Sequence, residues 1–527
     1  METTKRRGAV LIEELLQYAK HHKILKEDDV IWTRNQLMDL LQVDEPLSEP
    51  DNIDIAKPIP ESAAPILENI LDYCYGNGIL EENTLTHRDL LDTRIMGVFL
   101  SKPSEIKDEF YDIKEREGIQ SATNDFYHLC QKSNYIRMDR IQKNLMWNSS
   151  SPFGDLEITI NLTKPEKDPK EIAALKNAPQ SGYPRCMLCP ENIGYAGRVN
   201  FPARQTHRTI PLSLHGETWH FQYSPYVYYN ERCIVLKEKH VPMKITRDTF
   251  HRLFDFTDLF PHYFIGSNAD LPIVGGSILN HDHFQGGRYI FPMEKSGIEY
   301  GLRHDVDQEL EAAVVNWPMS VLRICSDNSV TLGDLAFSIL SKWREYSDPE
   351  HEILAYTTDK TENQIPHNTI TPIARKKQDG RYELDLVLRN NRTCKEHSLG
   401  IFHPHEDLHH IKKENIGLIE VMGLFILPGR LENELKSLSA YLTGKSTEQH
   451  NALNNPSHPL HHHRTWLKEL IQKYGSSLNE EQAKSILKKE VGIKCQRVLA
   501  DAGVYKTTAK GREGFNRFLA SVGFNRK

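Results

Sequence analysis

The sequence contains little cysteine. Eight cysteines are spread over 527 residues, and only Cys186 and Cys189 lie close together. A large chain with scattered cysteines has no disulfide framework and is typical of a reducing compartment, where a close pair binds a metal or takes part in redox chemistry. We therefore expect a cytoplasmic protein without structural disulfides.

Long apolar runs are missing as well. No segment approaches the roughly 18 apolar residues that a membrane-spanning helix needs, so we expect no membrane association. The N-terminal stretch METTKRRGAVLIEELLQYAKHHK is interrupted by Glu13 and Glu14, and it therefore has no apolar core of a signal peptide.

Positive charge is not in excess. Lys and Arg number 65 against 72 Asp and Glu, which gives a formal net charge of -7. Proteins that bind nucleic acids usually present a basic surface, so we expect no nucleic-acid partner. A small anionic substrate would need local cationic side chains or backbone N–H groups.

Hydrophobic periodicity predicts an α+β fold with antiparallel sheets, in two or more domains. AVLIEELLQYAKHHK and WTRNQLMDLLQV have helical spacing, whereas LEITINLT, WHFQYSPYVYYN, LPIVGGSILN and HFQGGRYIFP are typical of strands. We predict a helical region over 1–148, mixed regions over 149–345 and 346–435, and a second helical region over 436–527. The similar texture of the two mixed regions is consistent with an old duplication.

The stretch GGSILNHDHFQGGRY, residues 275–289, contains two histidines and a glutamine between two glycine pairs. If it is a strand, His281, His283 and Gln285 share one face, because side chains alternate with a period of two. That face would hold a metal-type ligand, a nucleophile and a neutral hydrogen-bond partner. The flanking glycines permit a close backbone approach to phosphate oxygens. The alternative is a polar strand face without chemistry.

The close cysteine pair stands in CMLCPEN. The spacing of Cys186 and Cys189 is that of a tight turn which aims two thiolates at one tetrahedral ion, although a redox pair or coincidence has the same spacing. No other CxxC exists, so further ligands must be histidines or carboxylates. We predict a closed, structural zinc site formed with His240, which follows a predicted strand, and His281. The alternative is that His240 is a surface residue.

The combination of CMLCPENIGYAGRVN, KEKH and SNADLPIVGGSILNHDHFQGG resembles the galactose-1-phosphate uridylyltransferase family, a branch of the histidine-triad-like superfamily. The long helical N-terminus, PHNTITPIARK, LVLRNNRT and GIFHPHEDLHHIKKENIGLIEVMG are similar to the second class of this family, found in Gram-positive bacteria. The resemblance covers most of the chain. It implies two histidine-triad-like halves with antiparallel sheets flanked by helices.

The activity that this resemblance implies is a ping-pong transfer of UMP. His283 would attack the α-phosphorus of UDP-glucose and release glucose-1-phosphate, and galactose-1-phosphate would then take UMP from the histidine to give UDP-galactose. An imidazole suits this role because it is a nucleophile near neutral pH. Gln285 would donate to a phosphoryl oxygen, where hydrolytic relatives have a third histidine.

The resemblance also implies substrate contacts. They are Asn268, Gly276 and Ser277 for the phosphates, Tyr195 and Phe221 for uridine, and Lys413 and Glu420 for the sugar phosphate. The last two reach across a dimer interface in the first class, so a homodimer is one expectation. Phe221 as a core residue is the alternative. The family's arginines upstream of the CxLC motif have no match here, and the spacing from Asn268 to His281 is longer than in the first class.

Other histidines lie in the C-terminal half. They are His367, His403, His405, His409 and His410. Glu299 lies where the first class has a carboxylate of a second metal site, but we favour polar packing or an exposed face over a second metal. We expect HPLHHHRTW, with His458, His461, His462 and His463, to be a solvated loop or an interface segment.

Two other functions remain open. The chain could be a nucleotidyl phosphorylase or hydrolase that acts on ADP-sugars or dinucleoside polyphosphates. The missing third histidine argues against a hydrolase, whereas phosphorylases also have glutamine there. The other alternative is a zinc-stabilised nucleotide-binding protein without turnover, against which His283 and the glycines argue.

Overall fold

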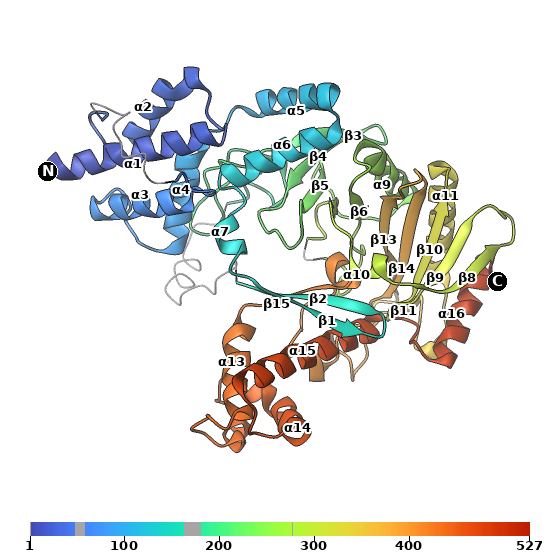
Figure 1. The fold of residues 1–527 in the computed structure, drawn as a ribbon. Coiled ribbons are helices and arrows are strands. Elements are labelled where there is room, and N and C mark those ends of the chain that lie inside the picture. The colour runs from blue at the N-terminus through green and yellow to red at the C-terminus, as the bar shows by residue number, and fades with distance from the viewer. Residues whose placement is uncertain (1, 48–57, 163–180, 277) are drawn as a thin grey trace. The chain divides into compact units, whose positions relative to one another are not determined.

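The computed structural model describes residues 2–47, 58–162, 181–276 and 278–527 (Figure 1). The chain divides into two compact units, Met1–Lys143 with Glu166–Val241, and Asn144–Pro165 with Pro242–Lys527. Each unit combines helices with mainly antiparallel strands, so the α+β prediction is confirmed. The domain limits expected from the sequence stay predictions.

The first unit begins with a helical region, as predicted. Its helices are α1 (Glu2–His21), α2 (Val30–Leu40), α3 (Ala64–Gly76), α4 (Leu85–Gly97), α5 (Pro103–Glu117), α6 (Ile119–Lys132) and the short α7 (Met138–Ile141). Leu11, Leu15 and Tyr18 recur on one face of α1 and are buried. They join apolar side chains of α3 and α4 in one core, so the periodicity explains this region.

A set of three strands follows in the first unit. β3 (Ile210–Leu214), β4 (Glu217–Tyr223) and β5 (Cys233–Lys237) pair antiparallel in that order. Trp219, Phe221 and Tyr223 alternate along β4 and are all fully buried. The hydroxyl of Tyr223 donates to the carbonyl of Thr123 at 2.9 Å, which fastens this face of β4 to α6.

The second unit contains a small and a large sheet. In the small one, β2 (Gly154–Asn161) lies between β1 (Leu145–Ser151), to which it is antiparallel, and β15 (Leu424–Pro428), to which it is parallel. The strands of the large one pair antiparallel in the order β7 (His283–Gly287), β6 (Phe264–Gly266), β13 (Asn368–Lys376), β14 (Tyr382–Asn390), β10 (Val321–Ser326), β9 (Glu311–Val315), β8 (Ile298–His304), β16 (Phe524–Arg526).

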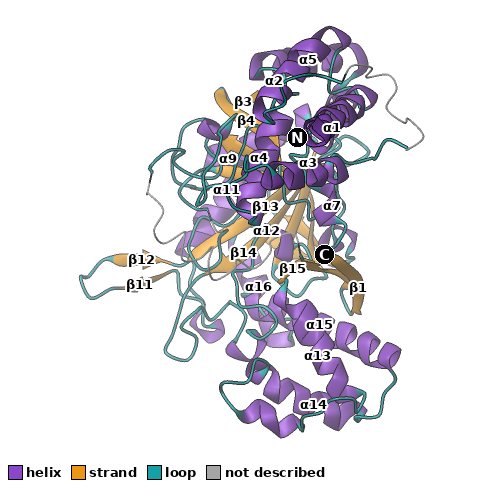
Figure 2. Cartoon of the chain, turned by 90° about the vertical axis from the view of Figure 1, so that its left-hand side faces the viewer, coloured by secondary structure: helices purple, strands orange, loops and turns teal. Residues whose placement is uncertain are grey.

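Helices of the second unit cover its strands. α9 (Arg247–Leu259) and α11 (Ser329–Glu345) contact each other and β13, and α15 (Glu480–Ala502) lies along β1. Figure 2 shows α15 together with α13 (Arg430–Leu442) and α14 (Arg464–Tyr474), and it shows the hairpin of β11 (Tyr356–Thr358) and β12 (Gln364–Pro366) extending away from the large sheet. α16 (Ala509–Ser521) precedes β16, so the helical C-terminal prediction is confirmed apart from that last strand.

Some strand predictions were wrong in extent. The described residues of LPIVGGSILN belong to no strand, and residues 272–274 form a turn in which Ile273 has φ 74, a left-handed conformation that β-branched residues rarely adopt. A Cβ on Gly275 would lie 2.5 Å from the carbonyl oxygen of Ala269, so the chain folds back too closely there for a strand. β7 begins at His283, so His281 precedes the strand that we expected it to open.

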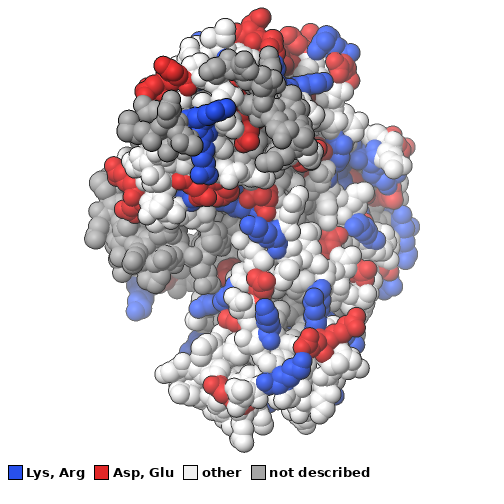
Figure 3. Space-filling view, turned by 60° about the vertical axis from the view of Figure 1, so that its left-hand side comes forward, with Lys and Arg blue, Asp and Glu red and all other residues white. Residues whose placement is uncertain are grey.

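The described surface carries both charges. On the face shown in Figure 3, Lys and Arg side chains are interspersed with Asp and Glu. In the first unit, for example, Lys20 lies 2.9 Å from Glu27, and Arg88 lies 2.9 Å from Asp72. Within the part of the chain that the structure describes, no helix is both long enough and apolar enough to cross a membrane.

Candidate active site

β7 carries the predicted nucleophile. It pairs antiparallel with β6, where Gly266 stands opposite Gln285. A side chain at Gly266 would meet Leu418 and the carbonyl of Pro372 at 2.9 Å, so glycine lets β6 pack closely against its neighbours. His283 and Gln285 are separated by one residue within β7 and are therefore on the same face, as predicted.

The imidazole of His283 has a defined tautomer. Its Nδ1 lies 2.8 Å from the backbone oxygen of His281. Because a carbonyl oxygen only accepts, Nδ1 carries the proton and donates it, and the lone pair of the neutral ring is on Nε2. His283 is 5% exposed, so bulk water has little access to it. A buried Nε2 with a lone pair is a candidate nucleophile.

Asn268 and Gly276, two of the residues proposed to contact phosphate, lie side by side. Asn268 is buried, and its Oδ1 accepts from the backbone N–H of Leu418 at 2.9 Å. Leu418 begins the short helix α12 (Leu418–Val421). A Cβ on Gly276 would lie 2.6 Å from Nδ2 of Asn268, so the close approach requires glycine. Ser277 lies outside the described residues.

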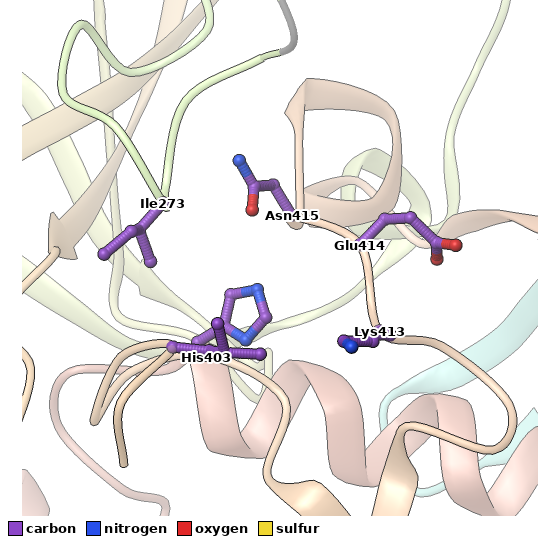
Figure 4. Close-up of a pocket in the computed structure, with 6 residues that line it drawn as sticks. Ile273, His403, Lys413, Glu414 and Asn415 are labelled. Atoms are coloured by element: carbon purple, nitrogen blue, oxygen red, sulfur yellow. The ribbon is translucent and has the colours of Figure 1, made fainter. Parts of the chain in front are cut away.

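Lys413 lines a cavity in the second unit. The cavity has a volume of about 330 Å³ and is lined by Ile273, Leu399, His403, Lys413, Glu414 and Asn415. Figure 4 shows Ile273, Asn415 and Lys413 around the ring of His403. Burial lowers the pKa of His403 to about 4, so this ring is neutral near pH 7. The exposed ammonium of Lys413 gives the cavity a positive group for an anion.

Glu420 does not line this cavity. Its Oε1 lies 3.1 Å from Nζ of Lys412, which also donates to the carbonyl of Ile426 at 3.1 Å. Burial alone would lower the pKa of Lys412, but Glu420 and Glu414 outweigh it and hold the pKa above its usual value. Lys412 was not among the predicted site residues, because the sequence does not show which lysine of this pair is buried.

Arg389 is a second buried cation that was not among the predicted site residues. It is 1% exposed, and it donates to the carbonyl of Ile416 at 2.9 Å and to the hydroxyl of Thr371 at 3.3 Å. Burial lowers its pKa to about 10, where Glu420 partly opposes the effect. Through its bond to Ile416, Arg389 therefore holds in place the segment that carries Asn415 and Leu418.

The two aromatic candidates for uridine differ. Phe221 is fully buried, with its ring 6.0 Å from that of Phe126 and 5.0 Å from that of Tyr223. This position favours the core alternative. Tyr195 is half-buried, and its hydroxyl accepts from Arg198 at 2.6 Å. Arg198 also lies over the ring of Phe201 at 5.0 Å, a cation that the sequence analysis did not single out.

Cys186, Cys189 and His240 converge in the first unit as part of a group able to hold a metal. The two sulfurs are 3.4 Å apart, too far for a disulfide, and Sγ of Cys189 is 3.0 Å from Nδ1 of His240. Asn192 is buried, and its Nδ2 donates to the carbonyls of Cys186 and Cys189 at 2.8 Å each, so it shapes the turn. Two sulfurs and one imidazole nitrogen fit the donor set of zinc. His281, in the second unit, is fully buried.

The remaining histidines are held by protein groups. His367 lies 2.8 Å from Asn391 and 2.7 Å from Thr357, and His409 lies 2.9 Å from the carbonyl of Pro404. Glu299 forms an ion pair with Arg512. These contacts fit the polar packing that we favoured. The expectation of a solvated loop was wrong for His463, which is fully buried.

Comparisons with known proteins agree on one family. The models of the N-terminal and C-terminal domains of galactose-1-phosphate uridyl transferase match residues 23–242 and 256–455. Galactose-1-phosphate uridylyltransferase of Caldanaerobacter subterraneus subsp. tengcongensis is 52% identical over 524 residues, 99% of each chain. The proteins of that name from Fusobacterium nucleatum and Bacillus subtilis are 51% and 47% identical over 516 and 518 residues, which is 97% of this chain in both cases and 98% and 97% of theirs.

Among solved structures, a yeast Ap4A phosphorylase matches with a TM-score of 0.30 and 11% identity, over 63% of this chain and 89% of its own. That likeness is too weak to carry an argument. The residues of this chain that the two domain models match, in contrast, contain the histidine strand, the cysteine pair and the residues that line the cavity, and the full-length relatives cover nearly the whole chain. The chain belongs to the galactose-1-phosphate uridyl transferase family.

Proposed function

We propose that the chain transfers UMP from UDP-glucose to galactose-1-phosphate through a uridylyl-histidine on His283. The hydrogen bond from Nδ1 of His283 to the carbonyl of His281 carries this proposal, because it leaves the lone pair on Nε2. Nε2 forms a bond to the α-phosphorus, and the bond from that phosphorus to the oxygen of glucose-1-phosphate breaks. In the second half, a phosphate oxygen of galactose-1-phosphate attacks the same phosphorus, and Nε2 leaves.

Uncharged donors hold the phosphates in this proposal. Gln285 shares a face of β7 with His283 and donates to a phosphoryl oxygen without adding a titrating group. Asn268 acts likewise, since Leu418 occupies its Oδ1 and its Nδ2 faces Gly276. Ser277 is proposed beside them from the sequence motif.

The acceptor sugar phosphate is proposed to use the cavity at Lys413. The ammonium would bind the phosphate in this cavity. Glu420 is fixed by Lys412 and is not part of the cavity lining, so it is proposed as a sugar contact from the sequence resemblance alone. Tyr195 is proposed against uridine, and Phe221 stays a weaker proposal because it is fully buried. As the sequence resemblance implies, we propose a homodimer in which Lys413 and Glu420 reach the donor site of the partner.

Zinc is proposed as a structural ion held by Cys186, Cys189, His240 and His281. The two sulfurs and His240 already converge, and the motif spacing adds His281. When bound, a closed four-ligand zinc supplies stability rather than chemistry. It would also hold His281, whose carbonyl accepts from His283. None of the eight cysteines, all of which lie in the described residues, is in a disulfide, which supports the cytoplasmic location that we propose.

The test is the mass of the intact protein after mixing with UDP-glucose in the absence of an acceptor. We expect a gain of one uridylyl group that disappears when galactose-1-phosphate is added. No gain with unconsumed UDP-glucose would refute the proposal. ADP-glucose and dinucleoside polyphosphates would then test the phosphorylase alternative in the same assay.

A further inference from the structure

A second converging group of metal-type ligands lies among the C-terminal helices. Glu434 is in α13, and His462 and His463 form the short 3-10 helix η7 (His461–His463). Oε1 of Glu434 is 3.1 Å from Nε2 of His462, and Oε2 is 3.0 Å from Nε2 of His463. One ligand atom from each residue lies within 4.8 Å of the others. All three belong to the second unit, and none contributes sulfur.

The histidine at the base of this group is rigidly held. The side chain of His463 is fully buried, and its Nδ1 lies 2.8 Å from Nδ1 of His410. The rings of His410 and His463 both pack against Trp466, at 5.1 and 5.7 Å. A histidine that binds a metal through one nitrogen usually donates the proton of the other to a nearby acceptor. His410 is placed to accept from His463 in this way.

The guanidinium of Arg430 lies where these three ligands converge. Nη1 of Arg430 is 2.5 Å from Oε2 of Glu434 and 3.3 Å from Nε2 of His462. The side chain of Arg430 is 33% exposed, so it can turn out into solvent. An ion and this guanidinium would compete for the same carboxylate oxygen.

We propose that Glu434, His462 and His463 bind a divalent first-row transition ion of the zinc type, which displaces Arg430. Two imidazole nitrogens and one carboxylate oxygen suit zinc and its neighbours, and such a three-ligand site keeps a position for water. The ion ties η7 and the start of α14 to α13. Through His463 and His410 it also supports the segment that continues to Lys412 and Lys413. The proposal is independent of the transfer reaction and of the cysteine site.

The competing explanation is that Arg430 alone completes the group. The two explanations differ in what Arg430→Gln does. If the arginine competes with an ion, its removal tightens ion binding, by about tenfold or more on the scale of changes next to a metal ligand. If the group is only a salt-bridge network, the same change creates no ion binding.

The experiment is a titration of the metal-free full-length chain with Co²⁺. Cobalt bound by thiolates has intense sulfur-to-metal absorption, whereas cobalt at this group has only weak bands without it. We expect wild type to bind one more Co²⁺ per chain than His462→Gln, a variant at a side chain 38% exposed that should fold normally. His461→Gln is the matched control, because His461 is in the same turn but bonds the carbonyl of Leu453 at 2.8 Å.

The expected results are loss of the thiolate-free cobalt signal in His462→Gln, its retention in His461→Gln, and tighter binding in Arg430→Gln. Equal cobalt stoichiometry in wild type and His462→Gln would overturn the proposal. Unchanged or weaker cobalt binding in Arg430→Gln would contradict the claim that Arg430 competes with the ion for Glu434. Because the thiolate absorption is read separately, the absence of zinc at the cysteine pair would not disturb either result.

Discussion

The side-chain oxygen of Asn268 accepts a hydrogen bond from the backbone N–H of Leu418 at 2.9 Å, across 150 positions of the sequence. This bond orients the amide so that Nδ2 faces Gly276. We predict that Asn268→Asp keeps the bond to Leu418 but lowers kcat/KM by about 10²- to 10³-fold, because a donor to phosphate becomes a negative charge. Steady-state kinetics and thermal unfolding check this. Normal kinetics in Asn268→Asp would show that Asn268 does not contact the phosphates.

His283→Gly is expected to abolish transfer while nucleotide binding remains. Without an imidazole no bond to phosphorus can form, and the loss should exceed about 10⁴-fold in kcat. Calorimetric binding of UDP-glucose serves as the control for folding. Turnover near the wild-type rate would exclude His283 as the nucleophile.

Cys186→Ser combined with Cys189→Ser should lower bound zinc by one ion per chain and lower Tm by about 4 °C or more, since a structural metal contributes to folding. Metal analysis and calorimetry measure both effects. Cys394→Ser is the control, because Cys394 lies outside the group of converging ligands. A double variant with unchanged Tm and metal content would show that the cysteine pair is incidental.

Lys412 and Lys413 should respond differently to the same change. Lys412→Met leaves the carboxylate of Glu420 without its partner, which is expected to cost about 3–5 kcal/mol of unfolding free energy. Lys413→Met should leave stability within about 0.5 kcal/mol but raise KM for galactose-1-phosphate about tenfold, because an exposed phosphate contact is lost.

Urea unfolding and kinetics on both variants test this pair. Glu420→Gln added to Lys412→Met should restore part of the lost stability, since the unpaired charge is removed. Equal effects of the two lysine variants on stability would contradict the assignment of Lys412 as the buried partner.

His403 should make the protein less stable as the pH falls. Its pKa is about 4 in the folded state because of burial, against about 6.5 unfolded, so the unfolded chain binds the proton first. Stability should therefore fall between pH 6.5 and 4 by up to about 3 kcal/mol from this group. His403→Gln should reduce the difference in unfolding free energy between pH 7 and pH 5. An identical difference in wild type and variant would show that His403 is protonated at its ordinary pKa.

The helical N-terminal region and the strand of His283 were predictable because their patterns are local. Leu11, Leu15 and Tyr18 share a helix face through backbone geometry within a few turns. His283 and Gln285 share a strand face through the period of two. The extent of the strands was less predictable, because residues after Ile273, which has a left-handed φ, fold back so that Gly275 approaches the carbonyl of Ala269, a contact that the alternation of residue types does not show.

The sequence by itself therefore determined the chemistry that is available: a nucleophilic imidazole, a cysteine pair and glycines at fixed spacing. Only the tertiary structure decided which groups meet. It placed Asn268 on Leu418, buried Lys412 rather than Lys413, and brought Glu434 to His462 and His463. The physical reason is that hydrogen bonds and ion pairs act over about 3 Å, whereas these partners are separated by up to 150 residues. The packing of the whole core decides which distant segments meet, because each apolar side chain must fit against all of its neighbours in the same close-packed interior.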